Sequence, residues 1–286
     1  GAIAEEVLAV GYDKIARPFA ATLVRMRRVT IVPDSSTQTI PFAALLDRAA
    51  RLPWVVSATL KVAPSVAMAV AASRSMPEWS PESIAVVTGD DRESRSLVPL
   101  PGAVAESRQL VSIYPRSKAL RAADLSVLTL REVMDGADVL HVAMHATADG
   151  RYLNQMTLGI RDERSGGWLN PETVFEDSVR APRLVILAAC QTARGPLLKG
   201  EILLSLARPF LLAGAAYVLV TLWDVPDRAT ERLMVGFHSA GADGVEPAEA
   251  LARAQRAVAA SPGSSSPWWS AFVMVAFMTP FVITDS

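Results

Sequence analysis

Short apolar runs bounded by turn residues recur along this chain and alternate with longer segments of helical periodicity. Most runs are continuous, which is typical of strands in a parallel sheet that is covered on both faces. The runs are Val29–Val32, Ile84–Thr88, Val139–Met144, Leu184–Ala189, Tyr217–Leu222 and Ala271–Phe277. The helical patterns are Ala103–Ile113, Ser126–Met134, Ile202–Leu212, Arg228–Ala240 and Pro247–Ala259. This alternation predicts an α/β fold with a mainly parallel central sheet flanked by helices.

The first 80 residues follow a different pattern. Glu5–Met26 has helical periodicity that is broken at Pro18, because proline removes a backbone donor and clashes with the preceding turn. Hairpins and short strands are predicted at Pro33–Ser36, Ile40–Phe42 and Val55–Val62. We therefore predict an N-terminal helix and hairpin subregion over residues 1–80 and the main α/β subregion over residues 81–286.

The composition is that of a globular protein with a large core. Of 286 residues, 51% are apolar and 20% charged, which excludes disorder as a description of the whole chain. The 28 basic and 29 acidic residues nearly cancel, so nucleic acid is not expected as a partner. The single cysteine, Cys190, excludes an internal disulfide framework and a multi-cysteine zinc site. A reducing, cytoplasmic location is the expectation.

The two ends raise separate questions. The sequence starts without Met and without the basic segment of a signal peptide, so we expect it to be part of a longer protein. Trp268–Ile283 is almost entirely apolar and is either a buried strand or a tail anchor. Its 16 residues fall short of the roughly 20 that span a bilayer, and it contains Pro280. We favour the buried strand and expect no membrane partner.

Two strand ends carry candidate chemistry, because open parallel sheets place reactive groups beyond the carboxyl ends of their strands. Val139–Met144 is followed by His145 and a turn-rich loop at 146–150, and Leu184–Ala189 is followed by Cys190. If the two strands are neighbours, the imidazole and the thiol emerge on the same rim. A base within hydrogen-bond reach is what a cysteine needs to become a thiolate near neutral pH.

Plainer interpretations exist for each of these residues. A lone cysteine after an apolar strand is by default a small buried hydrophobe, and a histidine there is a satisfied polar group. His141 points to the same side as His145 but lies deeper in the strand, so we interpret it as a core histidine. His238 lies late in a predicted helix, where the helix dipole explains it. About 13 Å of strand would separate His141 from His145, so we expect no metal site. The sequence also lacks the glycine-rich phosphate loops of nucleotide-binding enzymes, so we expect no cofactor.

The motifs of the chain, in their order, resemble the CHAT domain, the bacterial branch of the caspase- and separase-like cysteine peptidases. The matching segments are 138–145, 184–195, Gly200-Glu201, 210–215, 222–227, 250–255 and 269–273, preceded by 32–34, 40–45 and 63–65. They cover nearly the whole chain. The 45 positions between His145 and Cys190 are also close to the spacing of about 50 between the caspase histidine and cysteine.

The resemblance implies a caspase-like sandwich in which Cys190 is the nucleophile of peptide-bond hydrolysis and His145 its general base or ion-pair partner. The backbone N–H groups of Cys190 and Ala146 would then stabilise the oxyanion. Caspases usually have glycine after the catalytic histidine. If the backbone of Ala146 needs a positive φ, the alanine costs about 1 kcal/mol.

The resemblance also indicates where a substrate pocket would lie. Ala188, two positions before the cysteine, would line the pocket for the side chain that precedes the scissile bond. An uncharged wall favours an uncharged side chain, although Asp224 or Glu201 could add a charge from another loop. Glu201 is equally explained as a first-turn acid of a helix, and Asp227 as a helix cap before Arg228–Ala240.

A protein substrate and a regulating module follow from the same resemblance. CHAT domains commonly end larger proteins that carry tetratricopeptide-repeat or other sensor modules, which implies a regulated protease in signalling or defence. Two alternatives stay open: a catalytically inactive interaction module with this fold, and an unrelated α/β hydrolase or transferase with a buried cysteine. For a regulated protease we expect the loops at 146–153 and 194–199 to become ordered only when the partner module engages.

Overall fold

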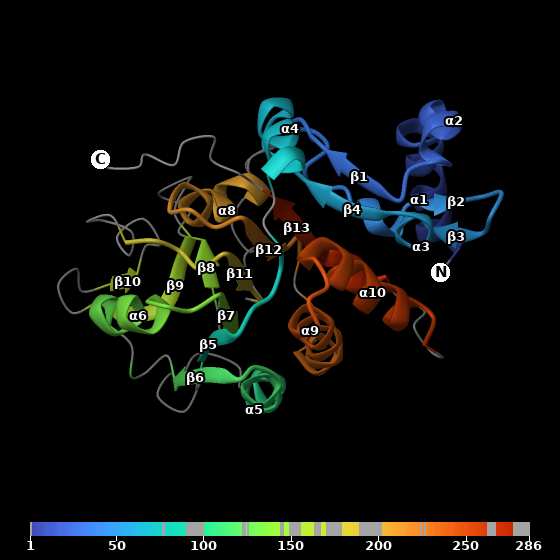
Figure 1. Ribbon diagram of the computed structural model, residues 1–286. Coiled ribbons are helices and arrows are strands. Elements are labelled where there is room, and N and C mark those ends of the chain that lie inside the picture. Colours follow the sequence, from blue (N-terminus) through green and yellow to red (C-terminus); the bar gives the residue numbers. More distant parts are fainter. Residues whose placement is uncertain are drawn as a thin grey trace.

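An eight-stranded sheet forms the centre of the computed structural model (Figure 1). From edge to edge its strands are β1 (Arg28–Ile31), β4 (Thr59–Val62), β13 (Phe272–Ala276), β12 (Tyr217–Thr221), β11 (Leu184–Leu187), β7 (Val139–Ala143), β5 (Ser83–Thr88) and β6 (Arg116–Arg121). β1, β4 and β13 run parallel to one another, as do β12, β11, β7, β5 and β6, and the two blocks meet antiparallel at β12 and β13. The α/β fold with a mainly parallel sheet is confirmed.

The structure describes residues 2–75, 78–89, 100–121, 124, 126–143, 146–148, 156–162, 167–169, 179–188, 202–223, 225, 227–261 and 267–276.

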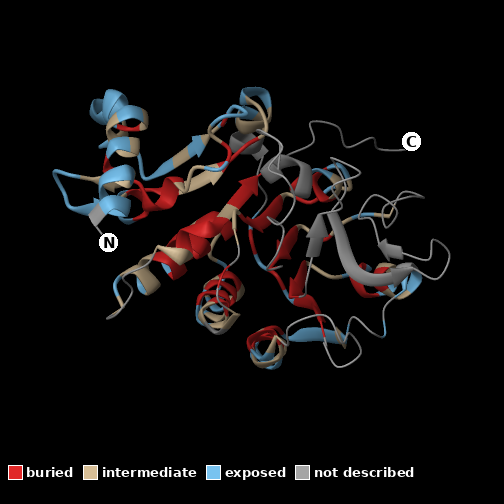
Figure 2. Ribbon diagram, turned by 180° about the vertical axis from the view of Figure 1, so that it is seen from behind, coloured by how far each residue is buried: buried red, intermediate tan, exposed pale blue. Residues whose placement is uncertain are grey.

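Helices cover both faces of the sheet. The helices α5 (Pro101–Ile113), α9 (Asp227–Ala242) and α10 (Pro247–Ala259) pack on one face, and α6 (Val127–Met134) and α8 (Ile202–Leu212) on the other. Every residue of β5, β7, β11 and β12 is buried, as the continuous apolar runs predict (Figure 2). The sheet therefore has a buried apolar layer on each of its two faces.

Local sequence signals determine where α6, the helix that precedes β7, begins and ends. α6 begins after Ser126, whose hydroxyl accepts the N–H of Thr129 while the Thr129 side chain accepts the N–H of Ser126. It is followed by Gly136 at φ +71°, a left-handed conformation that glycine adopts without steric cost. Asp138 then accepts the backbone N–H groups of Glu82 and Ser83 and so joins the starts of β7 and β5.

The N-terminal part has a small core of its own. Its elements are α1 (Ala2–Ile15), η1 (Arg17–Phe19), α2 (Ala20–Leu23), η2 (Phe42–Ala44), the two-residue strands β2 (Leu46–Asp47) and β3 (Leu52–Pro53), and α3 (Trp54–Ser57). Phe42, Leu45 and Trp54 form the centre of this core. The break of the first helical stretch near Pro18 is confirmed. Because β1 and β4 belong to the central sheet, the N-terminal part also shares that sheet, and a boundary near residue 80 stays a prediction.

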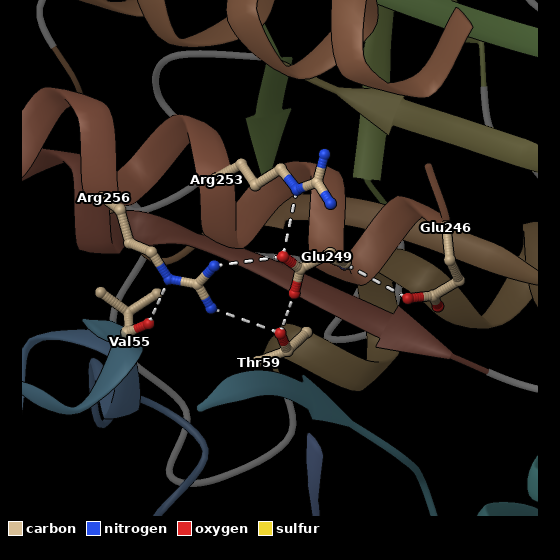
Figure 3. Close-up of polar contacts among 6 residues, drawn as sticks. All are labelled: Val55, Thr59, Glu246, Glu249, Arg253 and Arg256. Atoms are coloured by element: carbon tan, nitrogen blue, oxygen red, sulfur yellow. Dashed lines mark hydrogen bonds and ion pairs between the residues drawn. The ribbon is translucent and has the colours of Figure 1, made fainter. Parts of the chain in front are cut away.

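A polar cluster joins this part to α10 (Figure 3). The Glu249 carboxylate accepts from the Thr59 hydroxyl on β4 and, at 3.1 Å each, from Arg253 and Arg256. Arg256 also donates to the carbonyl of Val55 in α3 at 2.7 Å. Partial burial opposes ionisation of Glu249, but the hydrogen bonds from Thr59 and the arginines outweigh it and lower the pKa of the carboxyl.

Some elements differ from expectation. β6 was not predicted because Arg116–Arg121 is polar and mostly exposed; it is an edge strand whose backbone pairs with β5, and basic residues suit such an edge. The helix α4 (Val66–Ser75) was also not predicted. Val55–Val62, expected as one strand, begins with the helical turn α3 and becomes β4 only at Thr59.

The apolar C-terminal segment enters the sheet as a buried strand. After the helical turn η5 (Trp268–Ala271), β13 lies between β4 and β12, and its residues are buried except Val273, which is half-buried. The part of the segment beyond Ala276 lies outside the described residues. Among the described residues, no helix has the length and apolar character needed to cross a membrane.

Candidate active site

The strands that lead to the two candidate catalytic residues are direct neighbours. β7 and β11 pair in parallel from Val139 opposite Leu184 to Val142 opposite Leu187. The pairing continues past the end of β11, because the N–H of Ala188 donates to the carbonyl of Val142 at 3.0 Å. The condition that the sequence left open, adjacency of the two strands, is therefore met.

Four of the candidate site residues lie outside the described part of the chain. They are His145, Cys190, Glu201 and Asp224. Their roles stay predictions, and the site is built from the strand ends that precede them.

Alternation along β7 and β11 assigns a side of the sheet to each residue. Leu184, Ile186 and Ala188 pack with Val139 in the core layer under α5, α9 and α10, whereas Leu187 packs in the layer under α6 and α8. Ala188 is 8% exposed and is surrounded by apolar side chains. The wall that it contributes carries no charge, as expected from the sequence; its contact with a substrate stays a prediction.

The segment after the candidate histidine forms a strand. β8 (Ala146–Ala148), β9 (Met156–Asp162) and β10 (Gly167–Leu169) make an antiparallel three-stranded sheet, with Ala146 opposite Leu158. The expected turn-rich loop was wrong for residues 146–148, because pairing with β9 holds them extended; 149–150 lie outside the described residues. Since Ala146 is in a strand, it does not adopt the positive φ that would penalise an alanine.

A chain of buried polar side chains lies beneath this rim. His141 in β7 places Nδ1 3.0 Å from Nε2 of His238 in α9, whose Nδ1 lies 2.9 Å from the hydroxyl of Tyr114. The other nitrogen of His141 lies 2.6 Å from Oε1 of Glu106 in α5, at ion-pair distance but without the alignment of a hydrogen bond. All four residues are less than 5% exposed. The chain links α5, β7 and α9 through their interior.

Burial sets the charge state of the central histidine. Desolvation, and then the neighbouring His141, lower the pKa of His238 well below its usual value, so its imidazole is neutral. A neutral imidazole has one N–H, so it donates to one neighbour and accepts from the other. The dipole interpretation of His238 was wrong, because the side chain faces the sheet and not solvent at the helix end. The core interpretation of His141 is confirmed.

Asp227 lies at the start of α9, where the sequence indicated a helix cap, and its carboxylate also reaches a second helix. It is the first residue of α9, and its carboxylate accepts the N–H groups of Gly102 at 2.5 Å and Ala103 at 3.0 Å, in the first turn of α5. The residue before α5, Leu100, makes no side-chain cap of its own. A tertiary contact supplies the missing acceptor. In the sequence, Pro101-Gly102 was the signal for the start of α5, because proline is common at the first position of a helix.

The described residues also form a cleft away from the two candidate strand ends, with Arg131, Glu132 and Arg180 in its lining. The cleft, of about 610 Å³, lies at the opposite edge of the sheet, before the amino ends of β7 and β11, and Met134 and Pro182 also line it. Within the described residues, no three His, Cys, Asp or Glu side chains are grouped so that they could hold a metal ion.

Comparison with known proteins identifies the family. The model of the CHAT domain family matches residues 6–276. The chain belongs to the CHAT domain family. The relatives of this CHAT domain include tetratricopeptide repeat protein 28 of Homo sapiens, 28% identical over 196 residues, and that of Mus musculus, 35% identical over 94 residues. The matches cover 62% and 32% of this chain but only 8% and 4% of those proteins.

Solved structures show the same fold at low sequence identity. Separase in the Saccharomyces cerevisiae separase–securin complex superposes with a TM-score of 0.54 at 14% identity, over 87% of this CHAT domain and 15% of that chain. Gingipain R, an Arg-specific cysteine proteinase, superposes with a TM-score of 0.51 at 8% identity, over 96% and 66%. The CHAT domain therefore has the caspase-like α/β fold of these proteins, as expected from the sequence.

Proposed function

We propose that this CHAT domain is a cysteine endopeptidase with Cys190 as nucleophile and His145 as general base. The observation that supports it best is the adjacency of β7 and β11, with the N–H of Ala188 bonded to Val142. His145 lies two positions beyond Ala143, the end of β7, and Cys190 lies two positions beyond Ala188, which continues the pairing of β11. Two residues span at most about 7 Å, so we expect both side chains to start close to the carboxyl ends of β7 and β11.

Strand parity supports the same pairing. His145 has the parity of His141, which faces α5 and α9, and Cys190 has the parity of Ala188, which packs in the layer under the same helices. If alternation continues past the strand ends, imidazole and thiol emerge on one face of the sheet. His141 itself is completely buried and bonded to His238, so it is unavailable as the base.

The proposed reaction has two halves. The His145 imidazole takes the proton of the Cys190 thiol, and the thiolate attacks the carbonyl carbon of the scissile peptide bond. The tetrahedral intermediate collapses to a thioester as the imidazolium protonates the leaving amine. Water, deprotonated by the imidazole, then attacks the thioester, which releases the carboxylic acid product and restores the thiol.

Two backbone N–H groups are the proposed oxyanion donors, those of Cys190 and Ala146. Such a donor is worth about 3–4 kcal/mol of transition-state stabilisation. The strand conformation of Ala146 supports this assignment, since it places no steric penalty on the alanine.

The proposed substrate is a protein chain cut after an uncharged residue. Ala188 offers an apolar wall, and an unpaired charge buried against it would cost several kcal/mol. Glu201 and Asp224 are the charged candidates that could alter this preference from other loops.

The proposed partner is a tetratricopeptide-repeat or other sensor module, in the same polypeptide or in a second chain. It is supported by the relatives, which are named for tetratricopeptide repeats and whose length lies mostly outside the match. In this proposal the module controls the peptidase in a signalling or defence protein.

A direct test replaces the nucleophile. Cys190→Ala should abolish peptide turnover and labelling by an electrophilic peptide ketone, because the sulfur makes the covalent bond, while the melting temperature stays close to that of the parent. His145→Ala should also remove labelling. His141→Ala is the matched control: it should mainly lower stability, by about 2–3 kcal/mol, since Glu106 and His238 lose a buried partner.

Retained turnover in the Cys190→Ala protein would exclude the proposed nucleophile. A parent protein that is folded, unlabelled and inactive even with its partner module present would instead favour a catalytically inactive interaction module.

A further inference from the structure

A row of four side chains crosses the carboxyl ends of β5, β7, β11 and β12. Thr88 lies opposite Ala143 in the pairing of β5 with β7. The N–H of Ala188 donates to the carbonyl of the residue before Ala143, which is the bond that pairs these two alanines in parallel strands. Continued by two positions, the register of β11 with β12 brings Thr221 beside Ala188. We call Thr88, Ala143, Ala188 and Thr221 the rim row.

The rim row faces the helices α5, α9 and α10. The side chains two positions earlier in the same four strands lie under these helices, and one of them, His141, contacts α5 and α9 directly. Alternation gives the rim row the same side of the sheet. His145 and Cys190 are the next residues of that parity after Ala143 and Ala188. The proposed base and nucleophile therefore follow the two central members of the row, and the two threonines flank them.

Both threonine hydroxyls of the rim row are buried without a partner. Thr88 is 6% exposed and Thr221 4%, and neither hydroxyl has a hydrogen-bond partner among the described residues. By contrast, the equally buried hydroxyl of Thr59 donates to Glu249. A buried hydroxyl without a partner costs free energy, and native structures keep few of them. Two in one row, on either side of the proposed catalytic pair, indicate a function for a hydroxyl at this rim.

The strand order assigns that function to Thr88. β7 lies between β11 and β5, so the strand of the nucleophile is on one side of the proposed base and Thr88 is on the other (Figure 1). An imidazole has two ring nitrogens, and a histidine base needs a third group that orients it. We propose that Thr88 is the positioning residue of His145, and that its hydroxyl accepts the N–H of the ring nitrogen that faces away from Cys190. This inference rests on the proposed function.

Reach distinguishes Thr88 from the other polar groups of this face. Adjacent strands are about 4.8 Å apart, so Thr88 lies one strand from β7, whereas Thr221 lies two strands away, at about 10 Å. A ring carried by β7 meets the first hydroxyl and not the second. The buried carboxylate of Glu106 lies within 2.6 Å of His141 and is occupied there.

The contact would act on the charge state of the catalytic pair. When the thiol gives its proton to the imidazole, both ring nitrogens carry a proton. A hydroxyl that accepts the second N–H stabilises the charged ring and fixes its orientation. Because the charged ring in turn stabilises the thiolate, Cys190 ionises at a lower pH when Thr88 is present.

The test measures alkylation of Cys190 by iodoacetamide as a function of pH, read by mass spectrometry in the complete protein with its partner module. Thr88→Val keeps the shape of the side chain and removes the hydroxyl. We expect it to slow alkylation at pH 6.5 about tenfold, because less of the thiol is ionised, whereas Thr88→Ser should react like the parent. The melting temperature of the Thr88→Val protein should be unchanged or higher, since no structural hydrogen bond is lost.

Thr221→Val is the matched control, because Thr221 shares the row, the burial and the missing partner and differs in its strand. It should leave the alkylation rate close to that of the parent. Equal slowing by the two Val substitutions would overturn the proposal, and so would a Thr88→Ser protein as slow as Thr88→Val. A lower melting temperature of the Thr88→Val protein would overturn it as well, because the hydroxyl would then belong to a structural contact.

His145→Ala separates this inference from the proposed function. If His145→Ala slows alkylation at pH 6.5 and Thr88→Val does not, the pairing of His145 with Cys190 stands and the role of Thr88 is wrong. If His145→Ala has no effect on alkylation, the proposed pair is itself wrong, and the role of Thr88 is rejected with it. Alkylation does not require peptide hydrolysis, so the two results are read without a known substrate.

Discussion

At the scale of single residues, the contact between Asp227 and Gly102 holds two helices together. A Cβ added to Gly102 would lie 2.6 Å from Oδ2 of Asp227, and the closest atoms include backbone as well as side chain. Gly102→Ala should therefore displace the carboxylate from the first turn of α5 and lower the free energy of unfolding by about 1–2 kcal/mol. Denaturant unfolding measures the change.

The matched control is Gly236→Ala in α9. Its Cβ would make an ordinary contact, 3.8 Å from the Cβ of Ala254, so we expect it to be neutral or to stabilise the helix by up to about 1 kcal/mol. Equal effects of the two substitutions would mean that the lack of a side chain at Gly102 is not needed for the capping contact with Asp227.

The buried histidine chain predicts a pH dependence of stability. Because the pKa of His238 is lowered in the folded state, the unfolded state binds its proton first, near pH 6.5. Stability from this residue is therefore complete above pH 6.5 and is lost as the pH falls below it, by up to about 1.4 kcal/mol per pH unit. Urea unfolding between pH 7.5 and 5 measures the slope.

His238→Gln provides the comparison, since an amide side chain does not titrate in this range. The variant should be less stable at pH 7.5 but should lose less stability between pH 6.5 and 5 than the parent protein. If the free energy of unfolding decreased equally with pH in both proteins, groups other than His238 would be responsible for the acid sensitivity.

At the scale of elements, the junction between α10 and the N-terminal part depends on one arginine more than on its neighbour. Arg256 bridges Glu249 and the Val55 carbonyl, whereas Arg253, whose side chain is 56% exposed, contacts only Glu249 among the described residues. Arg256→Gln should lower the free energy of unfolding by about 1–2 kcal/mol, and Arg253→Gln by less than about 0.5 kcal/mol. Thermal unfolding of the two variants tests this; equal losses would show that the Val55 contact adds nothing.

At the scale of the whole molecule, the domain should depend on its partner module for full activity. We expect residues 1–286 alone to cleave slowly, because the loops at 149–153, which follow strand β8, and at 194–199 are predicted to become ordered only on engagement of the module. A peptide library treated with the domain alone and with the complete protein measures both rate and preference. Full activity of the isolated domain would contradict the latency, and strict cleavage after Arg, Lys or Asp would contradict the uncharged pocket.

Much of this organisation could be predicted from the sequence. Continuous apolar runs indicate strands that are buried on both faces, and the runs at β5, β7, β11, β12 and β13 all lie in the sheet. Strands with polar sequences could not be predicted in this way. Arg116–Arg121 forms the edge strand β6 by backbone pairing with β5, and backbone pairing leaves no pattern in the side chains. The motif order, with His145 and Cys190 at its centre, indicated the CHAT family that the comparison established.

Tertiary structure alone decided which distant residues meet. The sequence determined that a histidine and a cysteine each follow an apolar strand, but the pairing of β7 with β11 depends on how the sheet is ordered. Likewise, periodicity placed His238 and Asp227 on helices without showing that one contacts His141 and the other caps α5. Apolar pattern and turn chemistry are properties of neighbouring residues in the chain, and so the sequence determines the elements. Hydrogen bonds and burial between elements depend on packing of the whole core, which brings together residues about 100 positions apart.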